Sequence, residues 1–422
     1  CSFFIVISTI TKNLIMKRVI SFLFLILILI SCQEEQKSSL SEGIWLAELA
    51  VMDNEILPFN FKLMRNEVGQ YEMEIYNAEE IIPVDEISIK GDSIRIKFPV
   101  YEGYIAGTFS ENIIQGQFIK ESLDRIVPFK AIFGIQERFQ KSNPSQKNIS
   151  GIWETEFEKG TPKHYAAKGI FVQNGDEVTG TYRTTTGDYR YLDGVMSGDS
   201  LKVSAFDGAH AFVFIAKVTD STMSGAFYSG NHSKEVFEAK RNEVFELPSA
   251  DSLTFLKEGF DKLAFSFPDA TGSMVSLDDD KFKNKVVLVQ VMGSWCPNCL
   301  DESKFYVDYL KKNPDLDLEI VALAFEYAKT KEGAFKSISR LKDRIRIDYP
   351  ILLAQYGSSD KDLAQEKLPM LNHVLSYPTT IFIDKEGAVR KIHTGFNGPA
   401  TGEKFTEFKT EFDVFVKELH DE

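Results

Sequence analysis

The fold of the C-terminal part of this chain is decided by the stretch Gly293-Ser294-Trp295-Cys296-Pro297-Asn298-Cys299. An almost wholly apolar run at 286–292 comes before it, which is typical of a strand buried on both faces. After it, residues 297–312 carry apolar side chains at helical spacing. The chain has four cysteines in 422 residues. A pair kept two residues apart in so cysteine-poor a chain predicts dithiol chemistry rather than a disulfide-stapled scaffold.

The position of this pair predicts a role for each thiol. Cys296 is expected where a strand passes into a helix, and the amides at a helix N-terminus favour a thiolate. Cys296 is therefore predicted to be the nucleophile, and Cys299, one turn further, the resolving thiol. The alternative is half of a zinc site, which needs four ligands. No second cysteine pair or closely spaced histidine pair accompanies this one, so we expect a redox site without a metal or cofactor.

The bulk composition indicates a globular protein with an ample core, since 43% of the residues are apolar and 12% are aromatic. The formal net charge is −14, and no sizeable cluster of lysine and arginine occurs. Such a balance argues against a nucleic-acid partner.

Residues 1–31 are predicted to be a signal peptide whose true start is Met16. The apolar core at 19–30 has 12 residues, too few to span a bilayer comfortably. The small residue before Cys32 resembles a bacterial lipobox, which implies a diacylated Cys32. The residues that follow are polar and predict a tether over 32–42. An ordinary signal peptide with an incidental cysteine is the alternative. We expect a lipoprotein of the cell envelope that faces the periplasm, on the outer membrane rather than the inner one.

A repeat organises the next part of the chain. Gly43-Ile44-Trp45 returns as Gly151-Ile152-Trp153, and two further anchors recur at nearly the same offset. Alternating apolar residues and frequent turn signals predict short antiparallel strands throughout. We therefore expect two copies of an all-β module, 43–145 and 146–247, each a small sandwich or barrel. Trp45 and Trp153 are predicted to anchor the two cores.

After a linker over 248–264, which has helical spacing at 253–263, strands and helices alternate to the end of the chain. This order predicts an α/β domain over 265–422. Expected strands lie at 286–292, 318–325, 349–354, 379–384 and 389–393, and expected helices at 297–312, 331–343, 361–367 and 402–419.

A buried strand, the Trp-Cys-Pro-x-Cys turn, a helix and a later Pro-Thr before a hairpin strand resemble the thioredoxin fold. More narrowly, residues 263–420 resemble the TlpA/ResA type of thiol-disulfide oxidoreductase. The β-modules lie outside this resemblance and are similar to the β-domains often fused in front of such domains in lipoproteins of Bacteroidetes. The resemblance implies that Pro378 is a cis-proline facing the dithiol. It also links Glu302 to proton exchange with the thiols, although a solvated glutamate on the helix face is the alternative. Trp295 is predicted to cover the thiols as a lid.

The resemblance implies an enzyme that reduces disulfides in exported proteins, with electrons from a membrane donor of the thiol-transporting type and a membrane anchor at Cys32. Pro297-Asn298 between the cysteines departs from the commonest pattern, so the direction of electron flow stays open. Tyr377 is bulky for the position before the proline, which leaves open which substrates dock. Two alternatives remain. One is a thiol peroxidase, and the other is an anchored ligand- or protein-binding lipoprotein with a secondary redox role. The β-modules could also be plain spacers.

Overall fold

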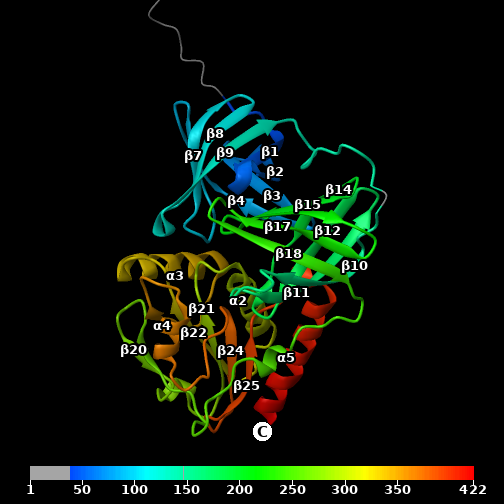
Figure 1. Ribbon diagram of the computed structural model, residues 1–422. Coiled ribbons are helices and arrows are strands. Elements are labelled where there is room, and N and C mark those ends of the chain that lie inside the picture. The colour runs from blue at the N-terminus through cyan, green and yellow to red at the C-terminus, as the bar shows by residue number, and fades with distance from the viewer. Residues whose placement is uncertain (1–38, 146) are drawn as a thin grey trace, which may run out of the picture. The chain divides into compact units, whose positions relative to one another are not determined.

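The computed structural model describes residues 39–145 and 147–422 (Figure 1). The predicted signal peptide, Met16, the lipidation residue Cys32 and most of the tether lie outside the described residues. Within the described ranges, no helix is both long and apolar enough to cross a membrane.

The first β-module is an antiparallel sheet in which successive strands are neighbours, except for β4 and β5. Its order is β4-β3-β2-β1-β9-β8-β7-β6-β5, so β1 joins the two halves and β4 and β5 form the edges. Strict alternation of buried and half-buried residues along β3 turns one face of the sheet to the core. The strands are β1 (Gly43–Ala50), β2 (Ile56–Arg65), β3 (Tyr71–Asn77), β4 (Glu80–Val84), β5 (Glu86–Lys90), β6 (Ser93–Lys97), β7 (Tyr104–Ser110), β8 (Ile113–Lys120) and β9 (Arg125–Phe133).

The second β-module repeats this arrangement and closes it. Its order is β11-β10-β18-β17-β16-β15-β14-β12-β13, and β11 also pairs with β12, so the sheet closes on itself as a barrel. The strands are β10 (Gly151–Phe157), β11 (Tyr165–Asn174), β12 (Glu177–Thr184), β13 (Gly187–Asp188), β14 (Leu192–Ser197), β15 (Ser200–Phe206), β16 (Ala211–Val218), β17 (Thr222–Ser229) and β18 (Ser233–Arg241).

The two modules are copies of one design, as the repeat predicts. Trp45 and Trp153 both lie on the first strand of their module, and both are fully buried. Each indole N–H donates to the carbonyl four residues earlier, that of Ser41 at 3.0 Å and that of Ile149 at 2.8 Å. The prediction of a duplicated all-β module with tryptophan anchors is confirmed, and the form is barrel-like.

The C-terminal domain has a mixed sheet of order β23-β22-β21-β24-β25. The central strand β21 runs parallel to β22 and antiparallel to β24, and all its residues are buried. The elements are β19 (Ser266–Pro268), β20 (Met274–Ser276), β21 (Val286–Met292), α2 (Pro297–Lys312), β22 (Leu318–Phe325), α3 (Lys331–Ile345), β23 (Ile351–Gln355), α4 (Lys361–Lys367), β24 (Thr379–Ile383), β25 (Val389–Thr394) and α5 (Glu403–Asp421).

Aromatic rings join two of these helices to the sheet. Phe412 of α5 lies 4.9 Å from Phe305 of α2, measured between ring centroids, and 5.7 Å from Phe382 of β24. This packing holds α2, the helix that carries the dithiol, against the rest of the domain. The prediction of an α/β domain after the β-modules is confirmed.

The helical spacing at 253–263 does not produce a linking helix. Only a single 3-10 turn, Ala250–Ser252, lies near this segment, and Leu256 forms an isolated antiparallel bridge with Leu371. The backbone N–H of Lys257 donates to Met370 O at 2.8 Å. Distant backbone partners therefore outweigh the local helical spacing here.

Candidate active site

The dithiol lies between the end of β21 and the first turns of α2. Cys296 is the N-cap of α2, and Pro297 occupies the first turn, where its missing N–H is not needed. The backbone N–H of Cys299 donates to Sγ of Cys296 at 3.2 Å. Both thiols are free, and Cys296 is 6% exposed while Cys299 is fully buried. Burial, with the neighbouring Cys296, raises the pKa of the Cys299 thiol well above its usual range.

The segment before β24 forms one wall of the site. The peptide bond between Tyr377 and Pro378 is cis. The thiol of Cys296 donates to the carbonyl oxygen of Tyr377 at 3.3 Å, so this backbone segment faces the first thiol. Trp295 packs edge-on against Tyr377, with centroids 5.6 Å apart, and its indole N–H donates to Phe325 O at 2.9 Å.

Glu302 lies one turn beyond Cys299 on α2 and is fully buried, so it does not belong to a solvated helix face. Its carboxylate accepts hydrogen bonds from Gln290 Nε2 at 2.8 Å and Thr380 Oγ1 at 2.9 Å. Burial raises the pKa of Glu302 to about 7, although these two hydrogen bonds oppose the change. A carboxyl group with such a pKa can exchange a proton near neutral pH.

A second buried acid, Glu326, was not predicted from the sequence. It follows the last residue of β22 and accepts from the backbone N–H of Ser294 at 2.7 Å and from Ser294 Oγ at 2.8 Å. Burial raises its pKa to about 7 as well. The available signal was an acidic residue directly after an apolar strand that ends beside the Cys-x-x-Cys turn.

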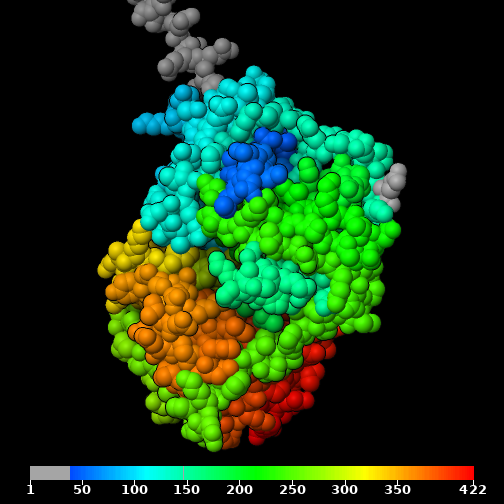
Figure 2. All heavy atoms as spheres, viewed as in Figure 1, coloured from blue at the N-terminus to red at the C-terminus, as the bar shows by residue number. Residues whose placement is uncertain are grey.

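Loops of the second β-module reach this site. Asn298, between the two cysteines, donates from Nδ2 to the carbonyl oxygen of Asp188 at 3.3 Å. Ser376, two residues before the cis-proline, donates from Oγ to Thr186 O at 2.9 Å. Gly187 has φ of +141°, and a Cβ atom there would lie 1.9 Å from Nδ2 of Asn298. Atoms of the second module thus lie directly against the C-terminal domain (Figure 2).

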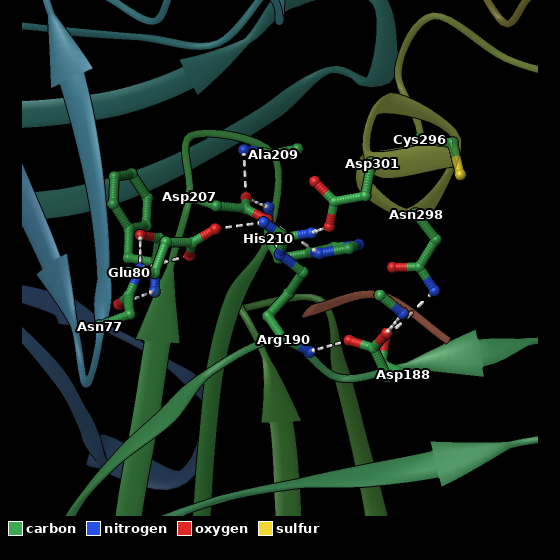
Figure 3. A network of polar contacts seen from close by, with 12 residues as sticks. Asn77, Glu80, Asp188, Arg190, Asp207, Ala209, His210, Cys296, Asn298 and Asp301 are labelled. Atoms are coloured by element: carbon green, nitrogen blue, oxygen red, sulfur yellow. Dashed lines mark hydrogen bonds and ion pairs between the residues drawn. The ribbon is translucent and has the colours of Figure 1, made fainter. Parts of the chain in front are cut away.

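A buried ion cluster joins all three parts of the chain next to the dithiol (Figure 3). Arg190 of the second module pairs with Asp301 of α2 and with Glu80 of the first module, and its Nε lies 3.7 Å from Oδ2 of Asp207. Burial opposes the charge of Arg190, but these carboxylates outweigh it and raise its pKa above its usual range. The backbone N–H of Arg190 donates to Asp188 Oδ1 at 2.8 Å. No local pattern in the sequence indicates this cluster, because Arg190 and Asp301 lie 111 positions apart.

Across residues 39–145 and 147–422, no group of three or more His, Cys, Asp and Glu side chains is arranged to hold a metal ion.

Comparison with known proteins places the C-terminal region. Residues 258–409 match the family described as Redoxin. Thioredoxin-like protein YneN of Bacillus subtilis (strain 168) is 29% identical over 140 residues, which cover 33% of this chain and 73% of that protein. Thiol-disulfide oxidoreductase ResA of the same organism is 26% identical over 140 residues, covering 33% of this chain and 69% of that protein.

Among solved structures, a thiol-disulfide oxidoreductase from Bacteroides fragilis NCTC 9343 is similar, with 17% identity and a TM-score of 0.26. The match covers 35% of this chain and 99% of the Bacteroides fragilis chain. The prediction of a C-terminal thioredoxin-like domain related to ResA is confirmed by the family match and the curated relatives. Residues 258–409 therefore form a redoxin domain of the thioredoxin-like thiol-disulfide oxidoreductases.

Proposed function

We propose that this protein is a membrane-anchored thiol-disulfide oxidoreductase that reduces disulfides in exported proteins through Cys296 and Cys299. The observation that carries the proposal is the placement of the free Cys296 thiol at the N-cap of α2, with the Cys299 N–H 3.2 Å from its sulfur. A helix N-terminus favours a negatively charged sulfur.

The reaction follows from this arrangement. The thiolate of Cys296 attacks one sulfur of the substrate disulfide, the S–S bond breaks, and the other substrate sulfur leaves as a thiolate that takes up a proton. Cys299 then attacks Sγ of Cys296, which releases the second substrate thiol and forms the Cys296–Cys299 disulfide. Two electrons pass from the dithiol to the substrate.

Glu302 is the proposed proton partner of Cys299. The high pKa of that buried thiol means that it must lose its proton before it attacks, and Glu302 lies one helical turn away. With a pKa of about 7, its carboxylate accepts the proton near neutral pH. The Tyr377 carbonyl and Trp295 would contact the substrate, since both lie beside the first thiol.

Continued turnover needs an outside dithiol that reduces the Cys296–Cys299 disulfide again, and we assign this role to a membrane donor of the thiol-transporting type. Diacylation of Cys32 would hold the chain at the membrane by burying its acyl chains, since the acidic protein is not attracted to anionic lipid. The outer membrane, on its periplasmic side, is the proposed location.

Single serine variants of the full chain test the reaction. Cys296→Ser should abolish reduction of a protein disulfide, and Cys299→Ser should accumulate mixed disulfides that gel electrophoresis without reductant reveals. Cys32→Ser replaces a cysteine outside the dithiol and serves as the matched control, with reduction retained. Undiminished activity of Cys296→Ser would disprove the proposal. In cells, the proteins trapped by Cys299→Ser would identify the substrates.

A further inference from the structure

Both β-modules and the redoxin domain line a cavity of about 230 Å³. Lys120 and Arg125, at the facing ends of β8 and β9, come from the first module, and His210 and His232 come from the second. Trp295, the neighbour of Cys296, supplies the redoxin side. A group bound in the cavity would therefore lie against the residue that precedes the nucleophile.

The charge of the cavity is one-sided. Four of the residues that line it are basic, and among the described lining residues none is acidic. The Nζ of Lys120 donates to the carbonyl of Ala209 at 3.0 Å, and no carboxylate within the described chain forms an ion pair with Lys120 or Arg125. His210 pairs with Asp207, which does not line the cavity, and the Nδ1 of His210 lies 3.2 Å from Oδ2 of Asp207 (Figure 3).

The basic groups disfavour one another's charge. Partial burial, and then repulsion by Arg125, lowers the pKa of Lys120 to about 8. The attraction of Asp207 and Glu102 opposes this change but is weaker. Partial desolvation, and then repulsion by Arg125 and Lys120, lowers the pKa of the rim residue His232 to about 4, so His232 is uncharged near neutral pH and Lys120 and Arg125 carry the repulsion. An anion in the cavity would relieve this repulsion and gain charge-assisted hydrogen bonds.

The net charge of the whole chain limits which acidic ligands can approach this cavity. The chain carries a formal net charge of −14, so its overall field repels an acidic ligand. The attraction of the basic cavity would therefore act only at short range, on a carboxylate that already lies beside the dithiol. Trp295 and Tyr327, with ring centroids 5.5 Å apart, add an aromatic surface on the redoxin side.

We propose that this cavity is a substrate-recognition site that binds a carboxylate carried next to the disulfide of the substrate. The inference rests on the proposed function, because it concerns the substrate of the same dithiol. It assigns the β-modules a part in substrate choice, through Lys120, Arg125 and His210, rather than the role of spacers.

Two disulfide-bonded peptides test this proposal with the full chain and dithiothreitol as the electron donor. The peptides are identical except that glutamates flank the cysteines in one and glutamines in the other. We expect kcat/KM to be about tenfold higher for the glutamate peptide, the factor that one charge-assisted hydrogen bond supplies. In the double variant K120M/R125M this ratio should fall to about one. The variant K90M/K141M removes the same charge from exposed lysines outside the cavity and should keep the ratio.

Equal kcat/KM values for the two peptides with the unaltered protein would overturn the proposal, and this comparison needs no variant to fold. Retention of the tenfold ratio in K120M/R125M would overturn it too. Failure to reduce either peptide would instead contradict the proposed reductase function, so the two ideas can fail separately.

Discussion

Replacing Glu302 by glutamine should remove a pH-dependent loss of stability from the redoxin domain. Glu302 is fully buried, and its pKa in the folded protein is about 7 against an ordinary value of 4.5. Between these two values the unfolded chain releases the proton while the folded chain retains it. Stability therefore falls as the pH rises from about 4.5 to 7. Glutamine is neutral at every pH and does not take part in this loss.

The magnitude follows from the separation of the two pKa values. At 1.36 kcal/mol per pH unit, the wild-type protein loses about 3 kcal/mol of unfolding free energy across this window. The variant also loses one of the hydrogen bonds that the carboxylate accepts from Gln290 and Thr380, which costs about 1 kcal/mol at all pH values. E302Q should therefore be slightly less stable than wild type at pH 4.5 and more stable by about 2 kcal/mol at pH 8.

Hydrogen–deuterium exchange of the β21 amides measures this difference for the redoxin domain without requiring the whole chain to unfold in one step. The amides of a fully buried central strand exchange when the domain unfolds. Exchange rates of the reduced protein, recorded from pH 4.5 to 8 and corrected for intrinsic rates, give the unfolding free energy of each variant.

A difference between E302Q and wild type that stays constant across this pH range would refute the reasoning. E366Q, which removes an exposed carboxylate from α4, is the matched control and should give a constant difference. E326Q should behave like E302Q, since burial also raises the pKa of Glu326 to about 7.

Two further variants test the contacts between the modules and the redoxin domain. Arg190→Met leaves the buried carboxylates of the ion cluster unpaired and should destabilise the protein by about 3–5 kcal/mol in thermal unfolding. Lys217→Met breaks an exposed pair and should cost less than about 1 kcal/mol, so equal losses would contradict a structural role for the cluster. Gly187→Ala should push its loop away from the dithiol and speed iodoacetamide alkylation of Cys296 about fivefold. This factor corresponds to a change of about 1 kcal/mol in the free energy of exposing the thiol. Gly175→Ala, also at positive φ but with no atom near its Cβ, should leave alkylation unchanged, and equal rates in the two variants would show that the loop does not cover the thiol.

Local signals are strong where the sequence predicted the fold correctly. The apolar run of β21 and the proline in the first turn of α2 define their elements without help from distant residues. At 349–354 the predicted strand was two residues early, since β23 is Ile351–Gln355. The segment at 253–263 failed for a tertiary reason, because its backbone bonds with residues more than a hundred positions away.

In the candidate site, too, local features could be predicted from the sequence and tertiary contacts could not. Cys296, Cys299 and Trp295 form one contiguous turn, so their proximity could be predicted. The surroundings of Glu302 depend on Thr380, which is 78 positions away, and for this reason the sequence left its environment open. The contacts of Asn298 and Asp301 with the second module depend on how separate domains pack, which no local pattern records.

The two β-modules should differ in how independently they fold. In the second, β11 and β12 bond to each other and complete the ring of strands. In the first, β4 and β5 remain edges, and Asp85 between them is bound by Arg344 of α3 at 2.5 Å. Because α3 is far along the chain, a polypeptide that emerges N-terminus first exposes these strand edges until the redoxin domain follows. The first module should therefore depend more on chaperones than the second, and it should be more prone to aggregate when synthesis stops early.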